Sequence, residues 1–353
     1  MNDNLSQLHA LWGRGRQFLG CEYAILGGAM TWVSERNLVS AISNAGGFGV
    51  LACGSMAPDL LRTEIRATFK MAHKPFGVNL ITMHPLLENL AQVCIEEHVK
   101  YVVLAGGLPN ASTIAKLKDA GIKVICFTPT LGLAKRLVKI GADALIIEGM
   151  EAGGHIGPVA TSILAQEILP FMKDVPVFVA GGIARGETIV SYLEMGAAGV
   201  QLGTRFVCAS ESIAHPKFKR CFIQANARDA VLSPQLDPRF PIIPVRSIAN
   251  EGMRGFIEAQ RNIIQQFDAG ELDQKQAQLA IEHYWAGALR RAVIEGDVEH
   301  GSVMAGQSVG LVTKEQPTNE IIHELVEQAC LALEHRAWVG RAQDGERRTG
   351  TRG

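Results

Sequence analysis

Eight short apolar runs, each of strand length, alternate with helical segments between residues 23 and 202 of this chain. Strands and helices in strict alternation form a parallel sheet with helices packed against it. A count of eight is better explained by a closed (β/α)8 barrel than by an open doubly wound sheet. The runs are Tyr23–Leu26, Phe48–Ala52, Phe76–Ile81, Tyr101–Ala105, Lys123–Phe127, Ala144–Glu148, Val175–Ala180 and Gly199–Leu202.

Two glycine-rich motifs that would point to other α/β folds are absent from the sequence. No GxGxxG follows the first run, and no GxxxxGK[ST] occurs anywhere. These motifs are the main support for a dinucleotide-binding Rossmann fold and for a P-loop fold. We therefore expect an α/β protein, a TIM (β/α)8 barrel with an inserted helical substrate domain after strand 8.

The segment from Val175 to Phe206 contains the seventh and eighth strands and the two turns that follow them. Gly181-Gly182 follows the seventh strand and Gly203-Thr204 follows the eighth. Backbone amides in such turns, with no glycine Cβ to block them, can bind a phosphate next to a helix N-terminus. Because many barrels hold a phosphate after their last two strands, the segment predicts a phosphate site. Two ordinary βα turns are the alternative.

Beyond Phe206 the alternation of strands and helices ends. Ser233–Arg246 contains four prolines and predicts an irregular, stiff connection. Helical patterns follow near Asn250–Gln266 and Asp273–Ile294, and a last one runs from Pro317 to about His335. The predicted division is a barrel of residues 1–213 and 296–340, a helical substrate or lid domain of residues 214–295, and a disordered tail of residues 341–353.

Composition and charge exclude several classes of partner. The formal net charge is −1, and the chain has four Tyr and four Trp, so neither charge nor aromatic stacking favours nucleic acid. No apolar stretch reaches the roughly 18 residues that span a bilayer, and the N-terminus has no apolar signal region. The seven cysteines form no CxxC pair and fit neither a disulfide framework nor a zinc site. We expect a soluble cytoplasmic protein with buried thiols.

Small or amide side chains stand at the carboxyl ends of the predicted strands, where barrels place their active sites. They leave room for a flat ligand against the backbone. This arrangement suits a mononucleotide with its phosphate at strands seven and eight and its ring over the barrel centre. The positions are Gly27-Gly28-Ala29-Met30, Asn79, Gly106-Gly107, Thr128 and the loop from Glu148 to His155.

His155 is the candidate acid or base of this site. It follows a Gly-rich loop, and imidazole exchanges protons near neutral pH. A loop histidine bonded to a backbone carbonyl is the alternative. His84 and His283 could also reach the cleft, although such residues are more often surface or packing histidines.

The sequence contains other clusters of charged residues, and each of them can be explained either by a function or by an ordinary structural role. Glu148 and Glu151 could form a glycosidase-like carboxylate pair, but no sugar platform accompanies them. No HExxH motif occurs, and we predict no metal site. The basic clusters Lys217-Lys219-Arg220 and Arg290-Arg291 are typical of solvated faces, or could receive an acidic carrier protein.

The chain resembles the nitronate monooxygenase family, formerly the 2-nitropropane dioxygenases, which includes the FMN-type enoyl-acyl-carrier-protein reductases. The resemblance runs from about Tyr23 to Glu327 and rests on several independent motifs in the same order. It implies an FMN-binding barrel with a helical substrate domain. The motifs are GGAMTWVSE, AGGFGVL, KPFGVNL, EGMEAGGHIGP, VAGGIARG, QLGTRF, the AHP at Ala214–Pro216, and GSVMAGQSVG.

By position, the resemblance implies a role for each part of the site. His155 matches the family's catalytic histidine. The strand ends would line the flavin, the turns after strands seven and eight would hold its phosphate, and Met30 and the loop Met304–Gln307 would border the isoalloxazine ring. The implied cofactor-binding residues are Gly28, Ala29, Met30, Asn79, Glu148, Gly149, Gly153, Gly154, Gly181, Gly182, Gln201, Leu202, Gly203, Thr204, Met304, Gly306 and Gln307.

Three positions, Gly27, Ala29 and Glu148, depart from the family pattern. Many relatives have Gln-Gly-Gly-Met where this chain has Gly27-Gly28-Ala29-Met30, and a methyl group at Ala29 could change the surroundings of the flavin. Glu148 stands where many nitronate oxidisers carry Gln. The motif EGMEAGGHIG is closer to that of the enoyl reductases. The resemblance therefore does not decide which substrate the protein uses.

The resemblance implies an FMN-dependent oxidoreductase, with oxidation of alkyl nitronates by O2 ranked first. The alternatives are an NAD(P)H-dependent enoyl-acyl-carrier-protein reductase, an NAD(P)H:quinone reductase on the same scaffold, and a flavin-binding protein without turnover. His155 would orient the nitronate or manage its proton, or else place the thioester. The expected partners are a small-molecule substrate and, for the enoyl reductase, an acyl carrier protein; a homodimer is an option that the sequence does not decide.

Overall fold

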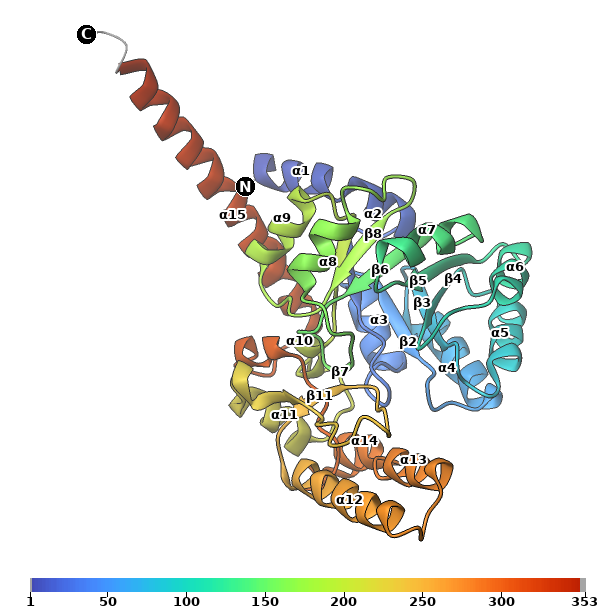
Figure 1. The fold of residues 1–353 in the computed structure, drawn as a ribbon. Helices are drawn as coiled ribbons and strands as arrows, with labels where there is room; N and C mark the ends of the chain where they lie inside the picture. The colour runs from blue at the N-terminus through green and yellow to red at the C-terminus, as the bar shows by residue number, and fades with distance from the viewer. Residues whose placement is uncertain (1, 350–353) are drawn as a thin grey trace.

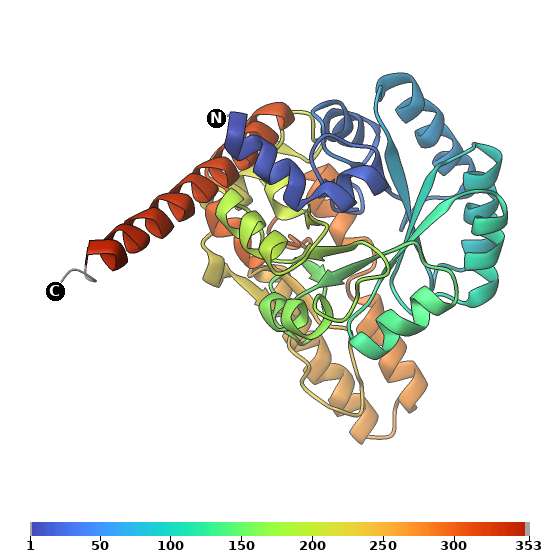
Figure 2. The ribbon, with the colours of Figure 1, turned by 90° about the horizontal axis from the view of Figure 1, so that it is seen from above.

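The structure, a computed structural model, describes the backbone of residues 2–349 and the side chains of residues 3–337. Eight parallel strands form one sheet in the order β1-β9-β8-β6-β5-β4-β3-β2, with helices around it (Figures 1 and 2). Gly27 N donates to Phe48 O and Phe48 N donates to Ile25 O, both at 2.9 Å, so the sheet closes into a barrel and the predicted TIM fold is confirmed. The strands are β1 (Ile25–Gly27), β2 (Gly49–Ala52), β3 (Phe76–Ile81), β4 (Tyr101–Ala105), β5 (Lys123–Phe127), β6 (Ala144–Glu148), β8 (Val177–Ala180) and β9 (Gly199–Leu202).

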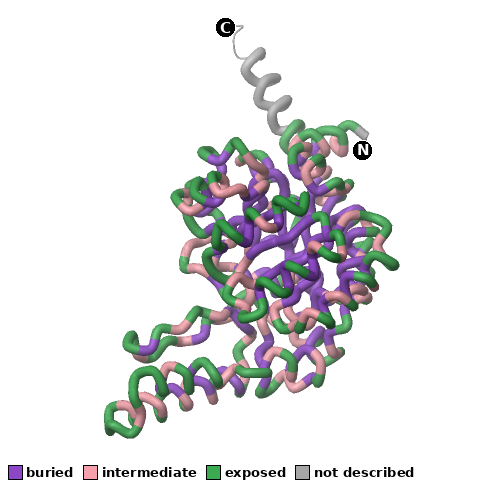
Figure 3. The backbone as a smooth tube through the Cα atoms, turned by 90° about the vertical axis from the view of Figure 1, so that its right-hand side faces the viewer, coloured by how far each residue is buried: buried purple, intermediate pink, exposed green. Residues whose placement is uncertain are grey.

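The barrel strands form where the sequence places its β-branched apolar runs. Every residue of β2, β8 and β9 is buried, because side chains fill the barrel on one face and helices cover the other. Figure 3 shows this buried backbone at the centre of the molecule. Five predicted ranges agree with the observed strands in every residue. β8 begins at Val177 rather than Val175, since Pro176 has no N–H to donate to a strand ladder.

Eight helices surround the barrel, and two more precede it. The N-terminal helices are α1 (Asn2–Leu11) and α2 (Gly13–Leu19), for which the sequence made no prediction. Phe18 O accepts hydrogen bonds from Tyr101 Oη at 2.9 Å and Lys123 Nζ at 3.0 Å, so α2 covers the amino ends of β4 and β5. The surrounding helices are α3 (Arg36–Asn44), α4 (Pro58–Met71), α5 (Leu87–Glu96), α6 (Ala111–Asp119), α7 (Leu131–Lys139), α8 (Thr161–Ile168), α9 (Gly186–Glu194) and α15 (Thr318–Thr349).

Residues 214–295 add further helices on the carboxyl side of the barrel (Figure 1). Phe240, Phe256 and Ile281 belong to a small core of their own, whereas Phe218 and Phe222 pack into the barrel core. The separate core therefore includes only part of the predicted lid domain. The boundaries of that domain stay a prediction. The elements are α11 (Pro216–Gln224), α12 (Glu251–Asp268), α13 (Gln274–His283), α14 (Ala288–Arg290) and a π-helical turn at Arg291–Glu295. The short helix α10 (Thr204–Val207) precedes them, directly after β9.

A second, three-stranded sheet was not predicted. β10 (Ala230–Leu232) pairs antiparallel with β11 (Val245–Ile248), which pairs antiparallel with β7 (Gly154–His155). Two of these strands, β10 and β11, lie within the predicted helical domain of residues 214–295. Each has only two to four residues, too few for an alternating pattern, and β7 exists only because the loop after β6 meets β11 in space.

The C-terminal helix is longer than predicted. α15 continues to Thr349, past the expected end near His335. The predicted disordered tail covers residues 341–353; its first part is helical backbone in α15, and residues 350–353 lie outside the described residues. Within the described part of the chain, no helix combines the length and apolarity that a membrane span requires.

Candidate active site

The turns after β8 and β9 form one wall of the candidate site. Gly181 and Gly182 have φ angles of 99° and 73°, which only glycine adopts without strain, and α9 begins four residues later at Gly186. Gly203 precedes α10, and a Cβ at Gly28 would lie 3.3 Å from its Cα atom. The two predicted phosphate turns and the loop after β1 therefore lie together at the carboxyl ends of the strands.

The loop from Glu148 to His155 forms the facing wall. Gly149 N donates to Ala180 O at 3.1 Å, which fixes the start of the loop against β8. At its end, His155 and Gly154 pair with Val245 and Arg246 of β11. The candidate histidine is thus held on a strand, not on a freely moving loop.

The third wall is the segment from Met304 to Gln307, far away in sequence. A Cβ at Gly153 would lie 2.6 Å from Gly306 N, so only glycine allows the two loops to approach this closely. Gly306 N donates to Thr204 Oγ1 at 3.0 Å, which joins the segment to the turn after β9. The structure therefore brings the predicted Met304–Gln307 loop to the predicted phosphate turn.

Several polar side chains at this end of the barrel have no protein partner. Within the described residues, nothing hydrogen-bonds to the carboxyl group of Glu148 or to the side-chain amide of Gln201, which is only 7% exposed. Asn79 Nδ2 donates to Val103 O at 3.0 Å and leaves its Oδ1 free. The free polar atoms of these three side chains keep contact with solvent, so they are available to a polar ligand. They come from β6, β9 and β3.

The surrounding protein shifts the pKa values of two titratable groups in the site. Desolvation by the surrounding protein raises the pKa of Glu148 to about 8, so its carboxyl group is mainly protonated at pH 7 and can donate a hydrogen bond. Desolvation also lowers the pKa of His155, and its imidazole is neutral at pH 7. A neutral ring has one donor and one acceptor nitrogen and can take up a proton.

The remaining predicted positions lie on the same side of the barrel. Ala29 and Met30 are half-buried in the loop after β1, and the Met30 Sδ atom would lie 3.5 Å from a Cβ at Gly203. Leu202 is buried in β9 and accepts a hydrogen bond from Gly28 N at 2.8 Å. All predicted site residues therefore belong to the walls described above or to the strand ends between them.

Other candidates from the sequence have structural partners. His84 Nδ1 accepts a hydrogen bond from Leu86 N at 3.0 Å, and His283 is exposed at the end of α13. Lys219 is buried and its ammonium group donates to Ala209 O and Glu315 Oε1, both at 2.8 Å, so that basic cluster is not a fully solvated face. Arg290 lies over the ring of Trp32, 5.8 Å from its centroid. The described residues contain no group of three or more metal-ligating side chains.

Sequence reasoning missed Arg246, which supports the site from β11. Its Nε donates to Met150 O at 2.9 Å and its Nη1 donates to Ala230 O at 2.6 Å, although the residue is only 4% exposed. The sequence signal was a single arginine between the β-branched residues Val245 and Ile248. The prolines before this stretch indicated an irregular connection, so no strand was expected there.

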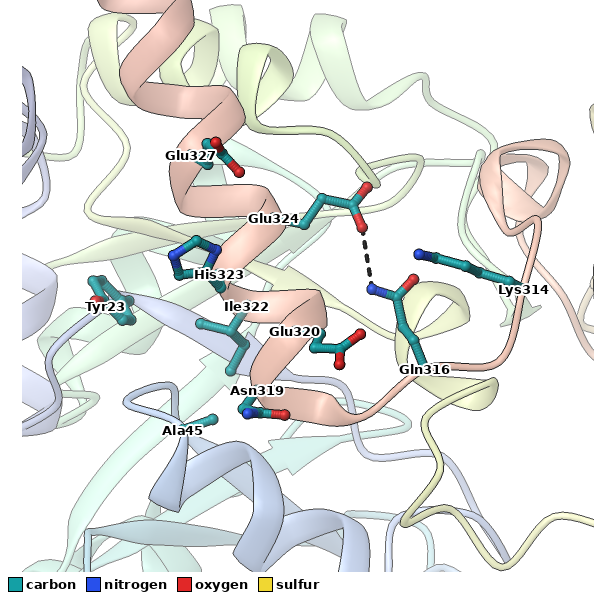
Figure 4. Close-up of a pocket in the computed structure, with 10 residues that line it drawn as sticks. All are labelled: Tyr23, Ala45, Lys314, Gln316, Asn319, Glu320, Ile322, His323, Glu324 and Glu327. Atoms are coloured by element: carbon teal, nitrogen blue, oxygen red, sulfur yellow. Dashed lines mark hydrogen bonds between the residues drawn. The ribbon is translucent and has the colours of Figure 1, made fainter. Parts of the chain in front are cut away.

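A separate pocket of about 470 Å³ lies at the amino-terminal end of α15 (Figure 4). Tyr23 and Ala45, which line it, precede β1 and β2, so the pocket is at the amino side of those strands. Glu324 closes one side and accepts a hydrogen bond from Gln316 Nε2 at 3.2 Å. Because barrels place their active sites at the opposite, carboxyl ends, this pocket is not the candidate active site.

Comparisons with known proteins agree with this geometry. A family model described as nitronate monooxygenase matches residues 14–328. A (3aS,4S,5R,7aS)-5-hydroxy-7a-methyl-1-oxo-octahydro-1H-indene-4-carboxyl-CoA dehydrogenase from Rhodococcus jostii is 32% identical, covering 90% of this chain and 96% of its own. A nitronate monooxygenase from Paraburkholderia phytofirmans is 28% identical, covering 90% and 94%. The structure of FabK from Thermotoga maritima superposes with a TM-score of 0.83 at 37% identity, covering 92% and 98%.

Proposed function

The chain belongs to the nitronate monooxygenase family, a family of flavin oxidoreductases, and from this premise we propose that it binds FMN and transfers electrons between FMN and a small organic substrate. The family and the enzyme class expected from the sequence are confirmed by this membership. We propose three things beyond this membership: which flavin is bound, what each site residue does, and which substrate reacts.

The residues of the site fit FMN. Backbone amides of Gly181-Gly182 and Gly203-Thr204 would hold the phosphate, since they are next to the starts of α9 and α10. The unpaired polar groups of Glu148, Gln201 and Asn79 offer both donors and acceptors, which the edge of an isoalloxazine ring requires. These polar groups without a protein partner, gathered from three strands at one end of the barrel, are the observation that carries the proposal.

When bound, the flavin supplies the electron-transfer chemistry, and the protein positions the substrate beside it. Neutral His155 can donate a hydrogen bond from one ring nitrogen or accept a proton at the other. Protonated Glu148 donates its carboxyl hydrogen without placing a negative charge in the site. We propose that the helices of residues 214–295, which lie on the carboxyl side of the barrel, form the substrate lid.

Oxidation of alkyl nitronates with O2 is the activity that the family model and the Paraburkholderia relative carry in their names. A nitronate is an anion, and the protonated carboxyl group of Glu148 places no negative charge beside it. His155 would donate its ring hydrogen to a nitronate oxygen and hold the substrate in one orientation.

Reduction of an enoyl thioester with NAD(P)H is the second candidate, and sequence identity favours it. FabK, an enoyl-acyl-carrier-protein reductase of this family, is 37% identical to the chain, and a dehydrogenase named for a CoA thioester is 32% identical; both values exceed the 28% of the nitronate monooxygenase. This reaction adds hydride to the β-carbon and a proton to the α-carbon. His155 would place the thioester, and an acyl carrier protein would deliver it.

One set of measurements separates the two candidates. Purified protein is reconstituted with FMN, and NADH or NADPH is added without oxygen, with bleaching of the flavin absorbance as the readout. Bleaching, followed by reoxidation with a crotonyl thioester, would support the reductase; oxygen uptake with propyl-2-nitronate in the absence of NAD(P)H would support the monooxygenase. A protein that does not bind FMN would refute the proposal as a whole.

A further inference from the structure

We propose that Glu151 is a positioning residue, which ties the His155 loop to the phosphate turn and so couples flavin binding to the placement of His155. The inference rests on the proposed function, because it assumes that a phosphate binds at Gly181-Gly182. Glu151 entered the sequence analysis only as a member of a carboxylate pair. Its contacts give it a different role.

The carboxylate of Glu151 is committed to Thr161, the first residue of α8. Its Oε2 atom accepts from Thr161 N at 2.9 Å and from Thr161 Oγ1 at 2.7 Å. The same hydroxyl lies 3.1 Å from Gly181 O, but it has one hydrogen to donate, and the charged oxygen is both nearer and the stronger acceptor. Thr161 therefore lies between Glu151 and the turn after β8.

The rest of Glu151 contacts two more segments of the site. A Cβ at Gly182 would lie 3.0 Å from the Glu151 Cβ atom, so the stem of the side chain packs directly against the phosphate turn. The backbone oxygen of Glu151 accepts from Gln307 N at 2.9 Å. One residue thus joins the loop after β6, the turn after β8 and the loop that begins at Met304.

The position of Glu151 within its own loop explains how it could affect His155. Glu151 lies four residues before His155, and the loop between them contains Gly153 and Gly154, which provide little stiffness. β7 fixes the far end of the loop through β11. Glu151 fixes its near end, together with the bond from Met150 N to Val159 O at 2.8 Å.

A purely structural explanation must be distinguished from this one. The residue before α8 is Ala160, which has no side-chain cap, so Glu151 also caps the helix from a distance. Asn110 provides a matched control, because it caps α6 by accepting from Thr113 N at 2.7 Å and α6 follows β4, away from the phosphate turn. Glu151→Ala and Asn110→Ala each remove one helix cap.

The experiment compares Glu151→Ala, Glu151→Gln and Asn110→Ala by FMN titration, by kcat and KM, and by hydrogen exchange of residues 149–156 in the flavin-free protein. For Glu151→Ala we expect an FMN Kd raised about tenfold, which is about 1.4 kcal/mol, a kcat lowered about a hundredfold, and faster exchange in the loop. Glu151→Gln keeps an oxygen that accepts from Thr161 and should recover most of both losses. Asn110→Ala should lower the melting temperature without any of these changes.

Equal Kd, kcat and loop exchange in Glu151→Ala and Asn110→Ala would overturn the inference and leave Glu151 as a helix cap. If Glu151→Ala does not fold, Thr161→Val and Thr161→Ser replace it: only the valine variant removes the hydroxyl bond and should reproduce the losses, and two variants that behave alike would refute the coupling. Failure of the unmodified protein to bind FMN would refute the proposed function instead. The two failures are therefore distinguishable.

Discussion

Glu148→Gln should stabilise the flavin-free protein at high pH and not at low pH. The pKa of Glu148 is raised from 4.5 to about 8 by desolvation. Between these values the unfolded chain has released the proton while the native protein still holds it, so the stability of the native protein falls as the pH rises through this range. Below pH 4.5 both states are protonated and no cost exists. Glutamine cannot ionise, so the substitution removes the contribution of residue 148 to the pH dependence of stability.

The magnitude follows from the size of the shift. One pKa unit corresponds to about 1.4 kcal/mol, so a shift from 4.5 to about 8 sets an upper limit of about 5 kcal/mol above pH 8. Because the residue is partly exposed to the cleft, solvent screening reduces this, and we expect about 2 kcal/mol.

Urea unfolding of the flavin-free protein, followed by circular dichroism, measures the effect at pH 4 and pH 9. Glu148→Gln should match the unmodified protein at pH 4 to within about 0.5 kcal/mol and exceed it by about 2 kcal/mol at pH 9. Glu167→Gln, the same substitution at an exposed site on α8, controls for the change in residue type. A stability difference that is the same at both pH values would refute the argument that Glu148 is held protonated by burial.

Three further predictions concern the walls of the site. His155→Ala should bind FMN as the unmodified protein does and lose turnover by about a hundredfold; unchanged turnover in the same assay would remove His155 from the reaction. Gly182→Ala should weaken FMN binding about tenfold, because alanine at φ 73° costs about 1 kcal/mol and its Cβ would contact Glu151. A fluorescence titration that shows an unchanged Kd would contradict this. Arg246→Met should lower stability by about 3 kcal/mol, since it leaves Met150 O and Ala230 O without their donor; thermal unfolding tests this, and Arg246→Lys should recover part of the loss.

Much of the barrel could be predicted from local sequence. A parallel strand buried on both faces must be apolar over its whole length, so runs such as Phe76–Ile81 and Gly199–Leu202 are visible without knowledge of their neighbours. The glycines at 181 and 182 were equally visible, because the positive φ angles there favour that residue type. These features depend on single segments of the chain.

The supporting contacts of the site could not be predicted in the same way. β7 contains only Gly154 and His155 and becomes a strand because β11, about 90 residues later, lies beside it. Glu151 looked like half of a carboxylate pair until the fold placed Thr161 against it. Such pairings involve segments with no local signal, and only tertiary contact defines them.

The sequence by itself determined the eight-stranded barrel, the position of the two glycine turns after β8 and β9, and the candidate histidine, because apolar runs, glycines and motifs can be read from single segments of the chain. The tertiary structure decided the state of those residues. It desolvated Glu148 and gave it no partner, which raises its pKa to about 8, and it left the amide of Gln201 unpaired two strands away, with β8 between them. Protonation and unsatisfied hydrogen bonds depend on the distance to other atoms and to water, and those distances exist only once the chain has folded.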